Sequence, residues 1–143
     1  MTEVTSESIE LIRLGDRQDS GGRTVAVRVG RRPTDRGTIA CDITITTEVV
    51  AGRFHAELTS GQLDDWEAAL DRLTRRSAVR WLDGEHGPEL RIEPTGPDGV
   101  WVTVSDVESS GVLVRLALTP AAGWVDEQRA LLVQVREALP REG

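Results

Sequence analysis

Lysine and tyrosine are absent from this 143-residue chain, cysteine occurs once, and no long apolar run is present. The single cysteine, Cys41, excludes an internal disulfide and predicts a reducing compartment. No stretch reaches the roughly 20 apolar residues that a membrane-spanning helix needs, and residues 1–8 are polar and acidic. From these absences we expect a cytoplasmic protein.

The charge of the chain is acidic. Its 17 basic residues are all arginine and stand against 24 aspartates and glutamates, which gives a net charge of −7. A chain of this charge repels phosphate backbones and anionic lipid surfaces. We therefore expect no nucleic-acid partner and no membrane partner, and a protein partner more basic than the chain itself. The absence of lysine is typical of a GC-rich genome and predicts no chemistry.

Apolar and polar residues alternate along most of the chain, most regularly from Thr38 to Leu58. Side chains of a strand point to opposite faces with a period of two, so this alternation predicts strands with one buried side and one solvent-facing side. Here it predicts strands at 38–49 and 52–58 around a turn at 50–52, with Cys41 and Val49 on the buried side. Cys41 is therefore expected to be an inert buried thiol. Similar patterns predict six more strands, at 9–14, 24–29, 78–82, 89–93, 100–105 and 112–118.

Two segments have the spacing of amphipathic helices instead. In the first, Thr59 and Gln62 have capping-box spacing, and apolar residues recur every three or four positions after them. The second helix is predicted to begin after Pro120 or at Gly123 and to end at Pro140, because proline lacks the N–H that continues a helix. The expected stripes are Leu63, Trp66, Leu70 and Leu73 in the first helix, and Val125, Gln128, Leu132, Val135 and Leu139 in the second.

The order of elements is four strands and a helix, twice over, and it predicts the fold class. We expect a single α+β domain over residues 1–143, with a flexible N-terminus at 1–8. Its framework would be a twisted, mainly antiparallel sheet of about eight strands with both helices on the dry face. An alternative is a half-barrel that wraps around the C-terminal helix and leaves a cavity between helix and sheet. The pattern of buried faces fits both architectures.

Catalytic constellations are missing from the sequence. His55 lies on the polar face of a strand, His86 lies in a loop, and Cys41 is expected in the core, so no nucleophile has a base beside it. No glycine-rich segment opens a helix as a nucleotide-binding loop must. The loop residues Asp83, Glu85 and His86 could together bind a cation. A metal-dependent enzyme that uses them is the weakest of three hypotheses about function, and the other two follow below. We expect no enzyme and no cofactor.

The polar side of the strands is the candidate interaction surface, because tryptophan and arginine are enriched at interface hot spots. The alternative is that this side is only solvated and carries weak cross-strand ion pairs. The candidate surface residues are Trp101, Arg91, Arg115, Arg28, Arg80 and His55. The second hypothesis is a small-ligand carrier with a pocket between sheet and helices, lined by Trp66, Trp81, Trp124 and Phe54.

Four segments, at 9–16, 63–71, 79–81 and 123–126, resemble a family of small uncharacterised actinobacterial proteins. The resemblance covers most of the chain. Its motifs are a capped helix that carries Trp66 and a strand that carries Trp81, so the resemblance implies a family and no reaction. The leading hypothesis is a non-enzymatic cytoplasmic interaction module, of the immunity or regulatory type, that binds a protein partner through the polar sheet face. An exposed edge strand would also allow a homodimer.

Overall fold

The computed structural model describes residues 8–16, 22–82 and 87–139. The predicted α+β class and the order ββββαββββα are confirmed. Ser8 begins the first strand, and the rest of the predicted flexible segment 1–8 lies outside the described residues. The first half contains β1 (Ser8–Gly15), β2 (Thr24–Pro33), β3 (Ile39–Thr46), β4 (Ala51–Leu58) and α1 (Ser60–Thr74). The second half contains β5 (Val79–Trp81), β6 (Glu89–Thr95), β7 (Gly99–Asp106), β8 (Val112–Leu118) and α2 (Trp124–Ala138).

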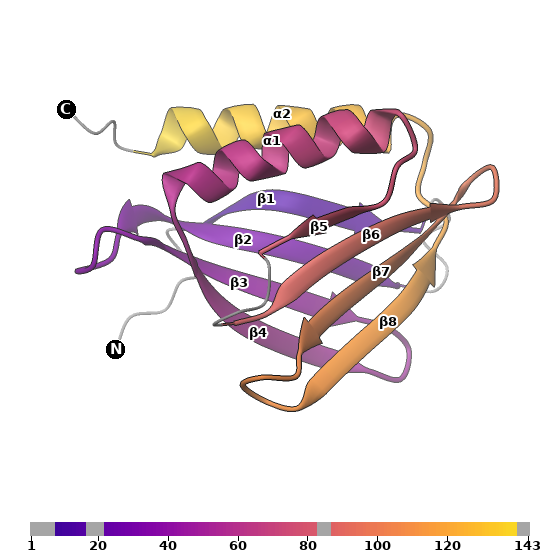
Figure 1. Cartoon of the computed structure of the whole chain (residues 1–143), viewed down its shortest axis with the longest axis horizontal. Coiled ribbons are helices and arrows are strands. Elements are labelled where there is room, and N and C mark those ends of the chain that lie inside the picture. The colour runs from indigo at the N-terminus through magenta and orange to yellow at the C-terminus, as the bar shows by residue number, and fades with distance from the viewer. Residues whose placement is uncertain (1–7, 17–21, 83–86, 140–143) are drawn as a thin grey trace.

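The eight strands form two antiparallel sheets rather than one. Their orders are β1-β2-β3-β4 and β5-β6-β7-β8, and the described residues form no closed barrel. The division falls at α1, a helix of 15 residues that separates β4 from β5, so these two strands are not joined by the short hairpin turn that can connect antiparallel neighbours. Since α2 lies along the edge strand β1 (Figure 1), the half-barrel around this helix is not the observed arrangement.

One hydrophobic core lies between the two sheets and beneath the helices (Figure 1). Buried residues of both sheets and of both helices belong to the same cluster. The apolar faces of the sheets therefore point toward each other, and their polar faces point in opposite directions. The continuous polar surface expected from the sequence is in fact two separate surfaces.

Each helix follows the last strand of one sheet and packs along an edge of the other sheet. α1 follows β4 but packs along β5, and α2 follows β8 but packs along β1. The two helices lie side by side and are joined by ion pairs (Figure 1). Arg129 contacts Asp71 at 2.9 Å, and Arg136 contacts both Asp64 and Glu67 at 2.6 Å. The packing of each helix on the opposite sheet and the ion pairs between the helices connect the two halves of the chain.

The starts of the helices follow their local sequences. The predicted capping box is present: the Gln62 N–H donates to Thr59 Oγ1 at 3.3 Å, and the Thr59 N–H donates to Gln62 Oε1 at 2.9 Å. α2 begins after Gly123, whose φ of 82° lies in the left-handed region that glycine adopts at little cost. The predicted stripe of α1 is buried throughout, whereas in α2 only Gln128, Leu132 and Val135 are fully buried.

Two local features break the simple alternation. β3 ends at Thr46, because the Thr47 hydroxyl accepts hydrogen bonds from the N–H groups of Val49 and Val50, at 3.1 and 2.8 Å, and so forms the turn. The predictions of a strand to residue 49 and of a buried Val49 were wrong, since this side chain is 89% exposed. In β1 the pairing with β2 shifts between Glu10 and Ile12, as a β-bulge does.

Cys41 is buried in β3, as predicted. Burial, with a smaller contribution from the Asp42 carboxylate, raises the pKa of its thiol to about 12. The thiolate that would react is therefore scarce at neutral pH. None of the helices in the described residues is both long enough and apolar enough to cross a membrane.

Candidate interaction surface

The outward side of the second sheet gathers four of the six predicted surface residues. The pairing of β5, β6, β7 and β8 places Arg80, Arg91, Thr103 and Arg115 in one row across the strands. On either side of this row lie shorter rows, one of Glu93, Trp101 and Ala117 and one of Glu89, Ser105 and Leu113. We call these ten residues the arginine face.

The period-two alternation of β6 and β7 produces this face. The residues between its members, among them Leu90, Ile92, Val102 and Val104, are buried in the core. Because a side chain that follows a buried neighbour must point to the other side of the sheet, the charged positions all lie on the same, outward side. The arrangement therefore follows from the strand sequences once their register is set.

The exposed charge of the arginine face is positive. The Glu89 carboxylate lies 3.6 Å from Arg80 and 3.1 Å from Arg91, and its side chain is only 11% exposed, against 61% for Arg80. Arg115 lies over the Trp101 ring, 4.5 Å from its centroid, and 3.9 Å from Glu93. A cation over an aromatic ring is a favourable contact that orients both groups. The face thus presents guanidinium groups to solvent, with one of them stacked on a tryptophan.

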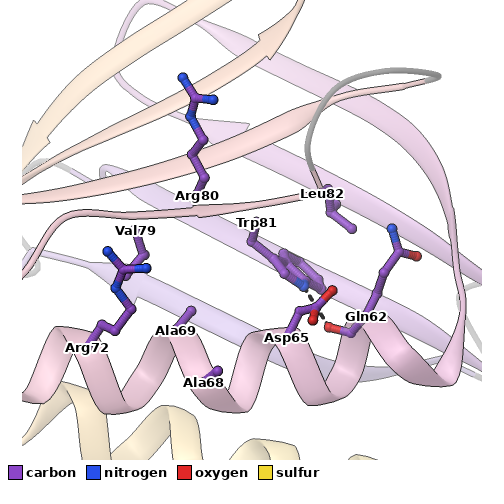
Figure 2. A pocket seen from close by; sticks show the side chains of 9 residues that line it. All are labelled: Gln62, Asp65, Ala68, Ala69, Arg72, Val79, Arg80, Trp81 and Leu82. Atoms are coloured by element: carbon purple, nitrogen blue, oxygen red, sulfur yellow. Dashed lines mark hydrogen bonds between the residues drawn. The ribbon is translucent and has the colours of Figure 1, made fainter.

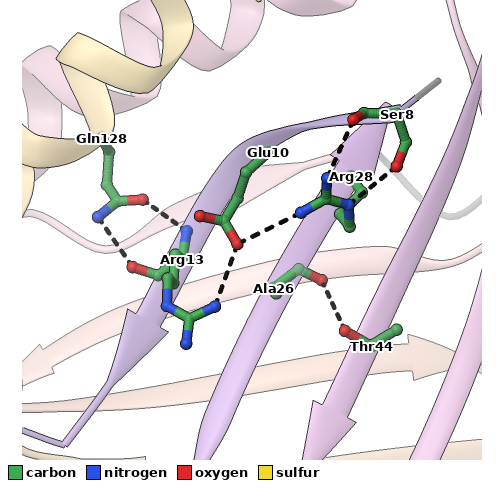
Figure 3. Close-up of polar contacts among 7 residues, drawn as sticks. All are labelled: Ser8, Glu10, Arg13, Ala26, Arg28, Thr44 and Gln128. Carbon is green, nitrogen blue, oxygen red and sulfur yellow. Dashed lines mark hydrogen bonds and ion pairs between the residues drawn. The ribbon is translucent and has the colours of Figure 1, made fainter. Parts of the chain in front are cut away.

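The outward side of the first sheet has a different charge pattern. The row across its four strands is Glu10, Arg28, Asp42 and His55, so acidic and basic or titratable residues alternate. Arg28 lies 3.8 Å from Glu10 and also donates to Ser8, at 2.9 Å to its hydroxyl and 3.0 Å to its carbonyl oxygen (Figure 3). His55 Nδ1 and Asp42 Oδ1 lie 2.5 Å apart, although the pair lacks hydrogen-bond geometry. On this side the Arg28 guanidinium is therefore compensated within the sheet by Glu10.

The structure therefore separates the predicted surface residues. Trp101, Arg91, Arg115 and Arg80 share the arginine face, whereas Arg28 and His55 lie on the first sheet. Two further positions were missed by the reasoning from sequence. Leu113 of the arginine face and Val112 beside it are both exposed. The signal was present in β8, whose sequence VLVRLAL is apolar at positions of both parities.

The structure places the four residues of the predicted pocket on four different elements. Trp66 and Trp81 pack against each other in the core with ring centroids 5.3 Å apart, Phe54 is buried on β4, and Trp124 is half-buried at the start of α2. A pocket of about 300 Å³ does lie between α1 and β5, and of these four residues Trp81 lines it (Figure 2). The Trp81 indole N–H donates to the Gln62 carbonyl oxygen at 2.8 Å.

The remaining predicted chemistry is that of the metal hypothesis. Asp83, Glu85 and His86, the residues of the metal hypothesis, lie outside the described residues. Within the described part of the chain, no group of three or more histidine, cysteine or acidic side chains is arranged to hold a metal ion.

Comparison of the chain with curated proteins and with solved structures gave no match. A family model did match, over residues 9–140, which is most of the 143-residue chain. The resemblance inferred from the sequence motifs is thereby confirmed at the level of an uncharacterised family, while the actinobacterial origin stays a prediction. The chain belongs to the family described as "Family of unknown function (DUF5959)".

Proposed function

We propose that this protein is a non-enzymatic interaction module that binds an acidic surface of a protein partner through the arginine face. The observation that carries the proposal is the row formed by Arg80, Arg91 and Arg115, three side chains of like charge on one face of a chain whose net charge is −7. A cytoplasmic location, with an immunity or regulatory role, is part of the proposal. The single buried cysteine supports that location.

The row is unfavourable for the isolated protein. Arg80 and Arg91 face each other directly on neighbouring strands, and like charges in this position destabilise a sheet. Glu89 compensates them in part, but it lies beneath them and leaves the guanidinium groups exposed. A carboxylate from outside would complete the compensation, because the planar guanidinium group matches a carboxylate with two parallel hydrogen bonds.

The same geometry supports an acidic partner rather than the basic one expected from net charge. Net charge acts over long distances, but the residues in direct contact decide which surface fits. Trp101, which is 36% exposed, would add apolar contact area next to Arg115. A protein partner is favoured over single-stranded RNA, because RNA-binding sheets stack bases on several aromatic rings and this face has one.

Affinity capture with matched variants tests the proposal. The tagged protein is used to capture partners from its native lysate, and each captured protein is then purified and its affinity measured. Trp101→Ala and Arg91→Glu should each weaken binding by about tenfold or more, as hot-spot substitutions do. Arg53→Glu makes the same charge change at an exposed position of β4 and should leave the affinity unchanged. The proposal is rejected if no protein is captured, or if the control weakens binding as much as the two variants do.

A second candidate function is a small-ligand carrier, and the pocket between α1 and β5 favours it. Its volume of about 300 Å³ is at the lower end of the range for ligand sites. Asp65 and Arg72 both line it, seven positions apart on α1, which corresponds to about 10 Å along the helix axis. Ala68 and Val79 provide apolar surface between them (Figure 2). An elongated ligand with a cationic end and an anionic end fits this arrangement.

Native mass spectrometry of the protein purified from its own cells tests the carrier function. A bound small molecule should be present in the wild-type protein and lost in Ala68→Leu, whose larger side chain fills the pocket. Partner binding through Arg91, Trp101 and Arg115 should be unchanged in the same variant, whereas Arg80 belongs to both the pocket and the arginine face. A wild-type protein without any bound small molecule, or one retained in Ala68→Leu, would exclude the carrier function at this pocket.

A further inference from the structure

The four edge strands of the two sheets are not equally open. The outer edge of β1 is covered by α2, where Gln128 accepts from the Arg13 N–H at 2.8 Å and donates to the Arg13 carbonyl oxygen at 3.0 Å. The outer edge of β5 is covered by α1. Among the described elements, no helix packs along β8 (Figure 1). β4 has only a few contacts with α1, far fewer than β5 has. Of the described edge strands, β4 and β8 therefore offer a free length to which another strand can pair. The C-terminal end of β8 is already engaged, because Arg23 donates to the Ala117 carbonyl oxygen at 3.1 Å.

These two edges differ in the side chains that flank them. The outward side of β4 carries Arg53, His55 and Glu57, and charged residues of this kind protect an edge from unwanted pairing. β8 carries one charged residue, Arg115, in an otherwise apolar strand. Val112 and Leu113 are 42% and 56% exposed, although they point to opposite sides of the sheet. Before Ala117, where Arg23 donates to the main chain, the β8 edge thus lacks the usual protection.

We propose that β8 pairs with an extended segment of the partner, which adds a fifth strand to the second sheet and places an acidic side chain beside Arg115. This inference rests on the proposed function and names the part of the partner that binds. Main-chain hydrogen bonds to the open edge would supply affinity, and the side chains on either side of the added strand would supply specificity. The added strand would lie about 4.8 Å from β8.

The charge of the added strand follows from the row that it extends. Reading across the sheet, the row is Arg80, Arg91, Thr103 and Arg115, and the next position belongs to the partner. Opposite charges directly across neighbouring strands are stabilising, so an aspartate or glutamate fits that position. The partner residues directly before and after this acidic residue would point to the core side of the sheet. They would lie next to Val114 and Leu116 and are expected to be apolar.

A second copy of this chain fits the edge less well. β8 contains no acidic residue, so no pairing of two β8 strands places a carboxylate beside Arg115. The most symmetric antiparallel pairing, centred on Arg115, places that side chain against its own copy. The charge of −7 on each chain adds repulsion between copies.

Short synthetic peptides of alternating valine and threonine, with one central glutamate on the threonine side, test the inference. The glutamate peptide should protect the β8 amides from hydrogen exchange and should bind at least about tenfold more tightly than the same peptide with lysine. Arg115→Glu should reverse this preference, and Arg53→Glu should leave it unchanged. N-methylation of every second amide removes the donors of one peptide edge, so of the two methylated isomers one should bind and the other should not.

Several outcomes overturn strand addition. If both methylated isomers bind equally, or if no peptide binds while the intact partner still depends on Arg91 and Trp101, the arginine face binds its partner without strand pairing. In those cases the proposed function stands and this inference fails. A concentration-dependent dimer with protected β8 amides in the absence of peptide assigns the edge to a second copy. Displacement of the glutamate peptide by an RNA oligonucleotide would contradict the partner class of both proposals.

Discussion

Replacement of Gln128 by leucine tests how α2 closes the edge of β1. Gln128 is 1% exposed, and its side-chain amide pairs with both main-chain polar groups of Arg13 (Figure 3). The side-chain NH2 group of Gln128 also donates to the Trp124 carbonyl oxygen at 3.0 Å. Leucine is similar in size and helix propensity but offers neither a donor nor an acceptor. Gln128→Leu therefore removes the polar pairing while it keeps most of the packing.

The expected loss follows from the two main-chain groups left without a partner. A buried N–H or carbonyl group that loses its hydrogen bond costs about 1–3 kcal/mol. Two such groups at a partly buried edge, where water can reach them in part, give about 2–4 kcal/mol. The added apolar surface of leucine returns about 1 kcal/mol. The free energy of unfolding should therefore fall by about 1–3 kcal/mol.

Urea denaturation measures the free energy, and hydrogen exchange locates the change. Exchange of the Arg13 amide should become faster than that of the neighbouring β2 amides, because Gln128 Oε1 is the acceptor of this N–H. Gln134→Leu, on the exposed side of the same helix, should change stability by no more than about 0.5 kcal/mol. If Gln128→Leu is as stable as this control and the Arg13 amide remains protected, Gln128 does not close the edge.

Gln128→Glu gives a pH-dependent version of the same test. The carboxylate can still accept from the Arg13 N–H, but it faces the carbonyl oxygens of Arg13 and Trp124 without a hydrogen to donate. Burial raises the pKa of such a carboxyl above that of the unfolded chain. The variant should therefore lose stability as the pH rises from the carboxyl pKa of the unfolded chain to the higher pKa of the folded protein. It should regain stability as the pH falls and the carboxyl is protonated. Equal losses for the glutamate and leucine variants at all pH values would contradict this account.

Three further predictions concern the core, the helix pair and the thiol. Trp81→Phe should cost about 1 kcal/mol more than Trp66→Phe in urea denaturation, because the Trp81 indole donates a hydrogen bond and that of Trp66 is buried without a partner among the described residues. Arg136→Ala should lower stability by about 1 kcal/mol or less at low ionic strength, and by less again in about 1 M salt, because its ion pairs are partly exposed. Cys41 should react with a thiol reagent near pH 8 much more slowly in the folded protein than in urea. The Cys41 thiol should lower the free energy of unfolding only as the pH rises above about 9, because the unfolded chain then loses the thiol proton while the folded protein keeps it.

Local patterns were sufficient for most of the elements. Alternation predicted all eight strands, and the spacing of Thr59 and Gln62 predicted a capping box that is present. The same rule failed at Val49, because the hydroxyl of Thr47 competes for the backbone and ends β3 earlier. Periodicity also placed Gln128 on the inward face of α2, but its bonds to Arg13, 115 positions away, are invisible to a local pattern.

The candidate surface shows where this knowledge from sequence ends. Parity along each strand was enough to assign Arg91, Arg115 and Trp101 to a polar side, because a strand has only two faces and its neighbours in sequence settle which one is buried. Parity does not say which strands share a sheet, and Arg28 and His55 were therefore grouped with residues that lie on the opposite side of the molecule. Sheet membership depends on where the helices cross and which edges they cover, and those are contacts between distant segments. The change from alternating charges on one sheet to a row of arginines on the other became visible only when these contacts had set the order and register of the strands.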